Sequence, residues 1–144
     1  QGRQKYLDYL EKLTVKYKLT NRVGFFGRYS DVPALMMVSN VILSTAIEPE
    51  AFGRISVEGQ AMGKIVVASN IGGSLDTIKD GVTGKLYQYD NPQALADALD
   101  WALSLSDAEK AAIGKAGIKN VKENFTKEIM CDKTIKVYKE LVNS

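Results

Sequence analysis

Short apolar runs alternate along this chain with longer segments in which apolar residues recur every three or four positions. The runs at 23–26 and 41–44 predict two buried strands, and the runs at 65–68 and 84–87 predict a third and a fourth strand. Strands that alternate with helices are typical of βαβ units, in which the strands are parallel. The sequence therefore predicts an α/β fold, with a Rossmann-like parallel sheet flanked by helices.

Helical periodicity and capping residues mark the segments between these runs. The chain opens with an amphipathic helix that carries Tyr6, Leu10 and Leu13 on one face. Further helices are predicted at about 31–38, 53–62, 74–79, 91–105, 107–123 and from 126 onward. No repeat, low-complexity stretch or linker interrupts the pattern, so residues 1–144 are expected to form a single domain.

Composition excludes several classes of function. The chain has no histidine, which excludes Ser-His-Asp and Cys-His catalysis and any metal site built on imidazole. Its one cysteine, Cys131, cannot form an internal disulfide. A net charge of +2 is too small for a general nucleic-acid binder. No apolar run approaches the roughly 20 residues that span a bilayer. We therefore expect a soluble, cytoplasmic domain with no nucleic-acid partner.

The charge is uneven along the chain. Residues 1–28 carry a local charge of +5, residues 29–108 carry −6, and residues 109–144 carry +3. One interpretation is that both basic ends lie near anionic lipid at the inner face of a membrane. The other is that lysines decorate the exposed faces of amphipathic helices.

The segment after the second predicted strand is the strongest candidate for a binding site. In parallel α/β sheets, ligands bind beyond the carboxyl ends of the strands, where helix N-termini present free amides. Gly53 would let a ligand approach the backbone, and free N–H groups from about Phe52 to Ile55 would suit a phosphate. Arg54 opposes the helix dipole, a placement that makes more sense if an anion normally binds there.

Two carboxylates flank this expected helix start. Glu50 lies in the loop before the helix, and Glu58 lies one to two turns inside it. Carboxylates accept hydrogen bonds from sugar hydroxyls, so the pair could hold a sugar on one side of a diphosphate and a ribose on the other. The alternative is an ordinary helix start with acidic residues near its positive end.

Residues 49–63 read PEAFGRISVEGQAMG, in which seven residues separate Glu50 from Glu58. This segment resembles the E-x7-E signature of retaining glycosyltransferases of the GT-B fold, family 4 (group 1). The strings DVPAL at 31–35, IVVAS at 65–69, IGG at 71–73 and DGVTG at 80–84 occur in the order of that family. The resemblance covers nearly the whole chain and implies the C-terminal, donor-binding domain of such an enzyme.

The resemblance also implies roles for individual residues. Glu50 would bind hydroxyls of the transferred sugar, as a catalytic group that orients the sugar and not as a covalent nucleophile. The sugar and the diphosphate would contact the backbone of Ala51, Phe52 and Gly53. Arg54 would bind beside them. Glu58 would bind the ribose, and the base would lie against Gly27, Arg28 and Tyr29.

The implied reaction transfers a hexose from a nucleoside diphosphate sugar with retention at the anomeric carbon, by a metal-independent route without a cofactor. No Asp-x-Asp pair, the metal–diphosphate motif of the other major glycosyltransferase fold, occurs in the chain. Arg54 directly after Phe52-Gly53 is a weak hint of lipopolysaccharide or polysaccharide synthesis.

The chain departs from the family at its start. By the resemblance, we expect residues 1–144 to start at a helix, after the strands that open the family's domain and carry a basic pair for the diphosphate, and not to include the N-terminal acceptor-binding domain. The run at 23–26 would then lose its neighbours in the sheet. The unpaired edges could pair with each other, between copies, or with a separate chain that supplies the missing strands. We expect these residues alone to be inactive as a transferase.

Other functions remain open at this stage. The chain could be a non-catalytic module that binds a nucleotide sugar, or part of another GT-B enzyme such as a sugar-nucleotide epimerase. A dinucleotide-dependent oxidoreductase is disfavoured, because no Gly-x-Gly occurs in the sequence.

Overall fold

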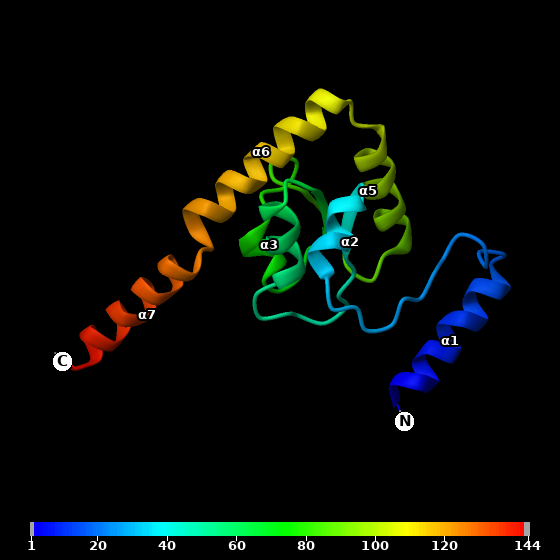
Figure 1. Cartoon of the computed structure of the whole chain (residues 1–144), viewed down its shortest axis with the longest axis horizontal. Helices are drawn as coiled ribbons and strands as arrows, with labels where there is room; N and C mark the ends of the chain where they lie inside the picture. Colours follow the sequence, from blue (N-terminus) through cyan, green and yellow to red (C-terminus); the bar gives the residue numbers. More distant parts are fainter. Residues whose placement is uncertain (1, 143–144) are drawn as a thin grey trace. The chain divides into compact units, whose positions relative to one another are not determined.

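A computed structural model describes residues 2–142 (Figure 1). Contacts within the chain group it into two compact units, Gln1–Val32 and Pro33–Ser144, and each unit is described by itself. The sequence-based prediction of a single domain stays a prediction.

The first unit consists of helix α1, Gly2–Lys16, and the segment that follows it. Tyr6 and Tyr9 stack on α1 with ring centroids 6.4 Å apart. The strand predicted at 23–26 is wrong: these residues form no strand, and the side chain of Phe26 is 77% exposed. A strand gains its hydrogen bonds only from a neighbouring strand, and no described residue pairs with this segment.

The second unit is built on a parallel sheet of three strands in the order β1-β2-β3. Strand β1 pairs with β2 from Val41↔Ile65 to Ser44↔Ala68, and β2 pairs with β3 from Val67↔Lys85 to Ser69↔Tyr87. Every residue of the central strand β2 is buried, as expected for a parallel strand that is covered on both faces. The strands are Val41–Ser44, Ile65–Ser69 and Lys85–Tyr87. The predicted α/β fold with a parallel sheet is confirmed.

Helices cover both faces of this sheet, because successive residues of β2 point to opposite sides. On one face α2 and α3 enclose an apolar cluster of Met36, Ile42, Val66, Ala68 and Ile78. On the other face α5 and α6 enclose a cluster of Ile65, Val67, Tyr87, Ala98, Ala102 and Ile113. These helices are Val32–Val38, Arg54–Ala61, Pro92–Ser104 and Asp107–Asn124.

Capping residues fix where the two long helices of this unit begin. Asn91 accepts a hydrogen bond from the Ala94 amide (3.0 Å) at the start of α5, whose first residue is Pro92. Ser106 and Glu109 form a reciprocal capping box at the start of α6. The pKa of the Glu109 carboxyl is lowered, first by the hydrogen bond from the Ser106 hydroxyl.

Two further helices complete the second unit. The short helix α4, Ser74–Thr77, follows β2, and the terminal helix α7, Lys127–Val142, follows α6. Figure 1 shows α7 continuing past the end of α6, away from the sheet. No residue of α7 is buried, so this helix contributes little to the core.

The sheet has two edges, because β1 and β3 each pair with one strand only among the described residues. The direct pairing of residues 23–26 with β1, which the sequence left open, is not found. Self-association through the unpaired edges stays a prediction. Among residues 2–142, the helices are too short or too polar to cross a membrane.

Helices α3 and α6 approach each other closely at glycine residues. A Cβ on Gly114 would lie 2.5 Å from the carbonyl oxygen of Gly63, which follows α3. A Cβ on Gly117 would lie 3.3 Å from the side chain of Gln60. The two glycines therefore let the backbone of α6 rest almost directly on the end of α3.

Replacing Gly114 by alanine should destabilise the fold, although alanine normally favours a helix over glycine. The added methyl group meets backbone, which cannot rotate away, so we expect a loss of about 1–3 kcal/mol in urea unfolding. Lys115→Ala, at an exposed position of the same helix, should stay within about 0.5 kcal/mol of the parent. A Gly114→Ala variant as stable as the parent would contradict the close packing.

Candidate functional site

The carboxyl ends of the parallel strands bring two loops of the second unit together. One loop, residues 45–53, leads from β1 to α3, and the other, residues 70–73, leads from β2 to α4. Strands β1 and β2 are in register through Ser44↔Ala68, so both loops leave the sheet at the same edge. This edge is where ligands bind in open α/β sheets.

The two loops are packed backbone against backbone. The Gly73 amide donates a hydrogen bond to the carbonyl oxygen of Glu50 over 2.8 Å. A Cβ on Gly72 would lie 2.6 Å from that same oxygen, and a Cβ on Gly73 would overlap the backbone of Phe52. Gly72 also has a φ of +57°, which disfavours other residues. Consecutive glycines after β2 therefore fix the position of residues 50–52.

Helix α3 begins directly after this contact. Gly53 is its N-cap residue, with φ 76° and no side-chain cap. The Gly53 carbonyl accepts from the amides of Ser56 and Val57. Among the described residues, no backbone acceptor pairs with the amides of Arg54 and Ile55. The helix start thus presents free N–H groups at the positive end of the helix dipole, as the sequence predicted.

Glu58 and Arg54 form an ion pair on α3. The guanidinium donates from Nη2 to Oε1 of Glu58 over 3.0 Å, at i,i+4 spacing. The Arg54 side chain is 82% exposed and the Glu58 side chain is 43% exposed. Such a surface pair contributes about 0.3–0.5 kcal/mol. A ligand that offers a phosphate to Arg54 and hydroxyls to Glu58 can therefore separate the pair at low cost.

Glu50 and Ala51 are exposed to solvent on the loop that precedes α3. The main chain of Glu50 is held by Gly73, which leaves its carboxylate as the part available to a ligand. The structure therefore brings together the residues predicted from the sequence around the start of α3, from Glu50 to Arg54, with Glu58 one turn further along the helix.

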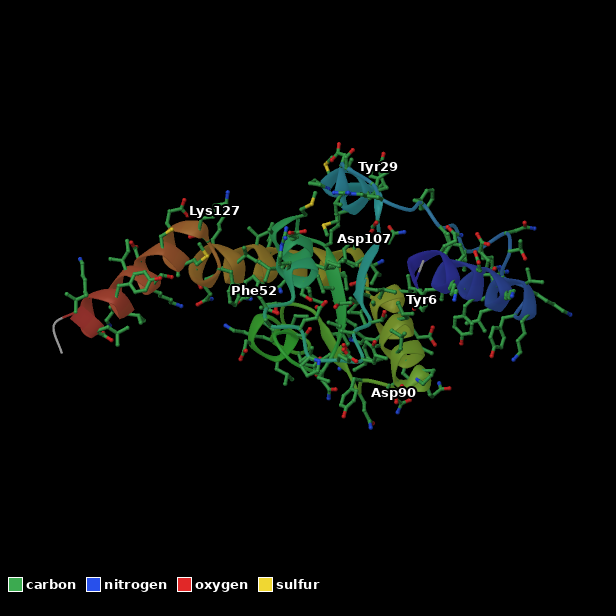
Figure 2. The ribbon with its side chains drawn as sticks, turned by 90° about the horizontal axis from the view of Figure 1, so that it is seen from below. Tyr6, Tyr29, Phe52, Asp90, Asp107 and Lys127 are labelled. Atoms are coloured by element: carbon green, nitrogen blue, oxygen red, sulfur yellow. The ribbon has the colours of Figure 1, made fainter. Side chains whose placement is uncertain are left out.

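The ring of Phe52 packs on the junction between α6 and α7. It meets Phe125 edge to face, with the ring centroids 5.8 Å apart and the planes at 70°. Figure 2 labels Phe52 on its loop and Lys127 in the first turn of α7. Both residues line an apolar pocket together with Ile129 and Met130. The loop before α3 is thus held by its side chain as well as by its backbone.

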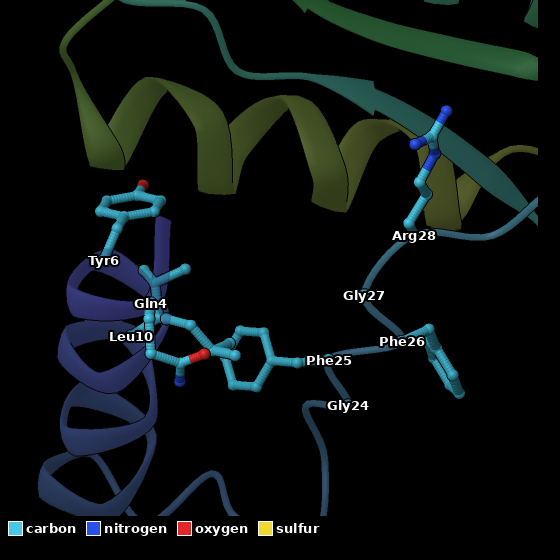
Figure 3. A pocket seen from close by; sticks show the side chains of 9 residues that line it. Gln4, Tyr6, Leu10, Gly24, Phe25, Phe26, Gly27 and Arg28 are labelled. Carbon is cyan, nitrogen blue, oxygen red and sulfur yellow. The ribbon is translucent and has the colours of Figure 1, made fainter. Parts of the chain in front are cut away.

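Gly27, Arg28 and Tyr29, the predicted base-binding residues, belong to the first unit. All three are exposed, and Gly27 has a φ of +64°. Gly27 and Arg28 help to line a pocket against α1, in which the ring of Phe25 points toward the helix while Phe26 points away (Figure 3). Their role toward a base stays a prediction.

Comparison with known proteins identifies the family to which this arrangement belongs. The family model described as "Glycosyl transferases group 1" matches residues 1–120. The chain belongs to this family. The crystal structure of a glycosyltransferase from Rickettsia africae is 38% identical, with a TM-score of 0.92, over 96% of this chain and 37% of that one.

Two further relatives of this group 1 domain are informative. Anabaena HepE, crystallised in complex with UDP, is 28% identical with a TM-score of 0.90, over 96% of this chain and 38% of that one. The D-inositol 3-phosphate glycosyltransferase of Mycobacterium leprae is 35% identical over 113 residues, which are 77% of this chain and 26% of that protein. The chain thus spans about a quarter to two-fifths of the length of these relatives. Its fold matches the corresponding part of GT-B glycosyltransferases.

Sequence reasoning gave no site role to three residues that join elements around this loop: Gln60 and Asn120, which hydrogen-bond to each other and to the Thr77 carbonyl, and Phe125, which meets Phe52. Asn120 follows Ile113 and Gly117 at helical spacing, so its position on the buried stripe of α6 could have been found from the sequence. The contact between Phe125 and Phe52 joins residues far apart in the chain and leaves no sequence signal. Among residues 2–142, no group of three or more acidic or cysteine side chains is arranged to hold a metal.

Gly73→Ala should displace the loop that carries Glu50. The new Cβ would overlap the Phe52 backbone, so we expect amide chemical-shift changes throughout residues 50–53 and a loss of about 1–3 kcal/mol in unfolding free energy. Ser74→Ala, which adds no atom at the next position, is the control. Unchanged shifts for residues 50–53 in Gly73→Ala would contradict the backbone contact.

Proposed function

We propose that this chain is the donor-binding part of a retaining glycosyltransferase that takes a hexose from a nucleoside diphosphate sugar. The observation that carries the proposal is the loop locked by Gly72 and Gly73, which holds Glu50 at the start of α3 with Glu58 one turn further on. Support comes from the relative HepE, which is 28% identical and has been crystallised with UDP-glucose.

The diphosphate would bind at the start of α3. The free amides of Arg54 and Ile55 and the positive end of the helix dipole suit an anion. Arg54 would exchange its exposed contact with Glu58 for a charge-assisted contact with a phosphate oxygen, worth roughly 1.5–3 kcal/mol. Gly53 is buried and a Cβ there would face Gly73 and Ser74 at 3.6–3.7 Å, so glycine is needed here for the positive φ of the turn and not for access of a ligand.

The two glutamates would hold the ends of the donor. Glu50 accepts hydrogen bonds from hydroxyls of the hexose, and Glu58, released by Arg54, accepts from the ribose. The backbone of Ala51 and Phe52 lies between them and would contact the sugar and the diphosphate. Gly27, Arg28 and Tyr29 would bind the base.

Catalysis would depend on stabilising the departing diphosphate and on orienting the sugar. The bond between the anomeric carbon and a diphosphate oxygen breaks, a bond to the acceptor oxygen forms on the same face, and the acceptor hydroxyl passes its proton to the departing diphosphate oxygen. Glu50 orients the sugar and forms no covalent bond. No metal or cofactor takes part in the proposed route.

The acceptor would bind to a separate N-terminal domain, since this chain spans only 37% of the Rickettsia africae structure. We propose that the complete protein acts in lipopolysaccharide or polysaccharide synthesis in the cytoplasm. The basic segments at residues 1–28 and 109–144 would then face anionic lipid. These 144 residues alone would bind donor without turning it over.

A second candidate is a non-catalytic module that binds a nucleotide sugar through the same residues. The free amides at the start of α3 and the exposed carboxylates of Glu50 and Glu58 would serve binding without transfer equally well. Sugar transfer by the protein together with an acceptor domain would decide for the enzyme.

Nucleotide selectivity tests the site as a whole. By isothermal titration calorimetry, the chain should bind UDP, GDP or ADP more tightly than NAD. The terminal phosphate of a nucleoside diphosphate carries more negative charge than the internal diphosphate of NAD, and the sequence has no dinucleotide fingerprint. Equal binding of NAD and of all three diphosphates, or tighter binding of NAD, would contradict the proposal.

Glutamine substitutions separate the roles of the two glutamates. Glu50→Gln should weaken UDP-glucose by about 10-fold or more and leave UDP unchanged, because only the hexose contacts Glu50. Glu58→Gln should weaken both ligands, because both contain the ribose. Glu48→Gln, a neighbouring exposed carboxylate, is the matched control and should change neither. Full UDP-glucose affinity in Glu50→Gln would overturn the assigned role.

A further inference from the structure

Two long polar side chains lie in the interior of the second unit. Gln60 on α3 is 0% exposed and Asn120 on α6 is 6% exposed. The Asn120 amide donates to Oε1 of Gln60 over 2.9 Å, although 60 residues separate them in sequence. Asn124, one turn later, donates to the Asn120 carbonyl and to its Oδ1 over 3.0 and 3.2 Å. The side-chain amides that join α3 to α6 are thus hydrogen-bonded to each other and to Asn124.

Both amides also converge on the main chain of α4. The carbonyl of Thr77 accepts from Nε2 of Gln60 over 2.9 Å and from Nδ2 of Asn120 over 3.0 Å. A backbone carbonyl has two lone pairs, so the two donors saturate it. The end of α4 is therefore tied to α3 and to α6 at one buried atom.

The hydrogen bonds continue from α4 to the loop that carries Glu50. Three donors of α4 reach the Gly73 carbonyl: the amides of Asp76 (3.2 Å) and Thr77 (3.1 Å) and the Thr77 hydroxyl (2.9 Å). Thr77 is 1% exposed. The Gly73 amide in turn donates to the carbonyl of Glu50 over 2.8 Å. A continuous path, here called the polar relay, thus runs through Asn120, Gln60, Thr77, Gly73 and Glu50.

Burial makes the polar relay specific. An unpaired amide or carbonyl in this interior loses its hydration without compensation, so each member favours the one arrangement that satisfies all of them. That arrangement fixes α3, which carries Glu58, relative to the loop that carries Glu50. The buried residues Gln60, Thr77 and Asn120 therefore determine how the Glu50 and Glu58 carboxylates are spaced.

We propose that Gln60, Thr77 and Asn120 are positioning residues for the donor site. They hold the Glu50 loop and α3 in the geometry that the hexose and the ribose require, through Gly73 and without contact to the ligand. This inference rests on the proposed function, and its structural part, the fixing of Gly73 against Glu50, can be tested without a ligand.

Threonine-to-valine substitutions provide a matched test. Thr77→Val keeps the shape of the side chain and removes its hydroxyl bond to the Gly73 carbonyl, whereas the bonds from the Asp76 and Thr77 amides to that carbonyl remain. Thr83→Val makes the same change at a second buried threonine, which is 2% exposed and whose hydroxyl accepts from the Lys79 amide, outside the polar relay. Asn120→Leu interrupts the relay at its other end.

Two measurements on the chain read out the effect. Hydrogen exchange of the Gly73 amide, followed by NMR without ligand, should be about 10-fold faster in Thr77→Val and Asn120→Leu than in Thr83→Val. The affinity for UDP-glucose relative to UDP should fall about 3- to 10-fold in the same two variants and stay unchanged in Thr83→Val. A purely structural role would affect Thr77→Val and Thr83→Val alike.

Each outcome decides the inference. Gly73 exchange in Thr77→Val equal to that in Thr83→Val would overturn it, and if Asn120→Leu does not fold, Thr77→Val decides alone. Faster Gly73 exchange with an unchanged ratio of affinities would also overturn it, because the loop would then move without consequence for the sugar. If the parent chain binds no UDP-glucose, the proposed function fails, and the exchange comparison still tests the structural part.

Discussion

The hydrogen bond from the Gly73 amide to the Glu50 carbonyl is the contact on which the rest of the site depends. It joins the loops after two neighbouring strands, and it requires glycine at 72 and 73 because any side chain there would occupy the space of the facing backbone. Glu50 therefore stands on an anchored main chain in spite of lying in a loop. Because the loop is already held in place, binding of a ligand to the Glu50 side chain does not carry the entropy cost of ordering the loop.

This anchoring also explains why the interior of the domain contains polar side chains. Apolar clusters cover both faces of the sheet and supply most of the driving force for folding, but the hydrophobic effect itself has no preferred direction. The amides of Gln60 and Asn120 add that direction, since a hydrogen bond has a preferred length and angle. The glycines at 114 and 117 allow α6 to come near enough for these amides to meet.

Much of the second unit could be predicted from the sequence. The predicted strands at 41–44, 65–68 and 84–87 agree with β1, β2 and β3 to within a residue. The physical reason is plainest for β2, since a parallel strand buried on both faces is a nearly continuous apolar run. Asn91 and Ser106 mark helix starts through caps that act within three residues. The strand predicted at 23–26 failed for the complementary reason: its apolar residues suit a strand, but a strand exists only with a partner.

What the sequence determined by itself is therefore local: the type of each element in the second unit, the start of α3 at Gly53, and the spacing of Glu50 and Glu58 around it. The tertiary structure alone decided that Gly72 and Gly73 lie against the Glu50 loop, that Phe52 meets Phe125, and that Asn120 reaches Gln60 and Thr77. The physical reason is range. Periodicity and capping act over a few neighbouring residues, whereas these contacts join segments that become neighbours only when the sheet and its helices have packed.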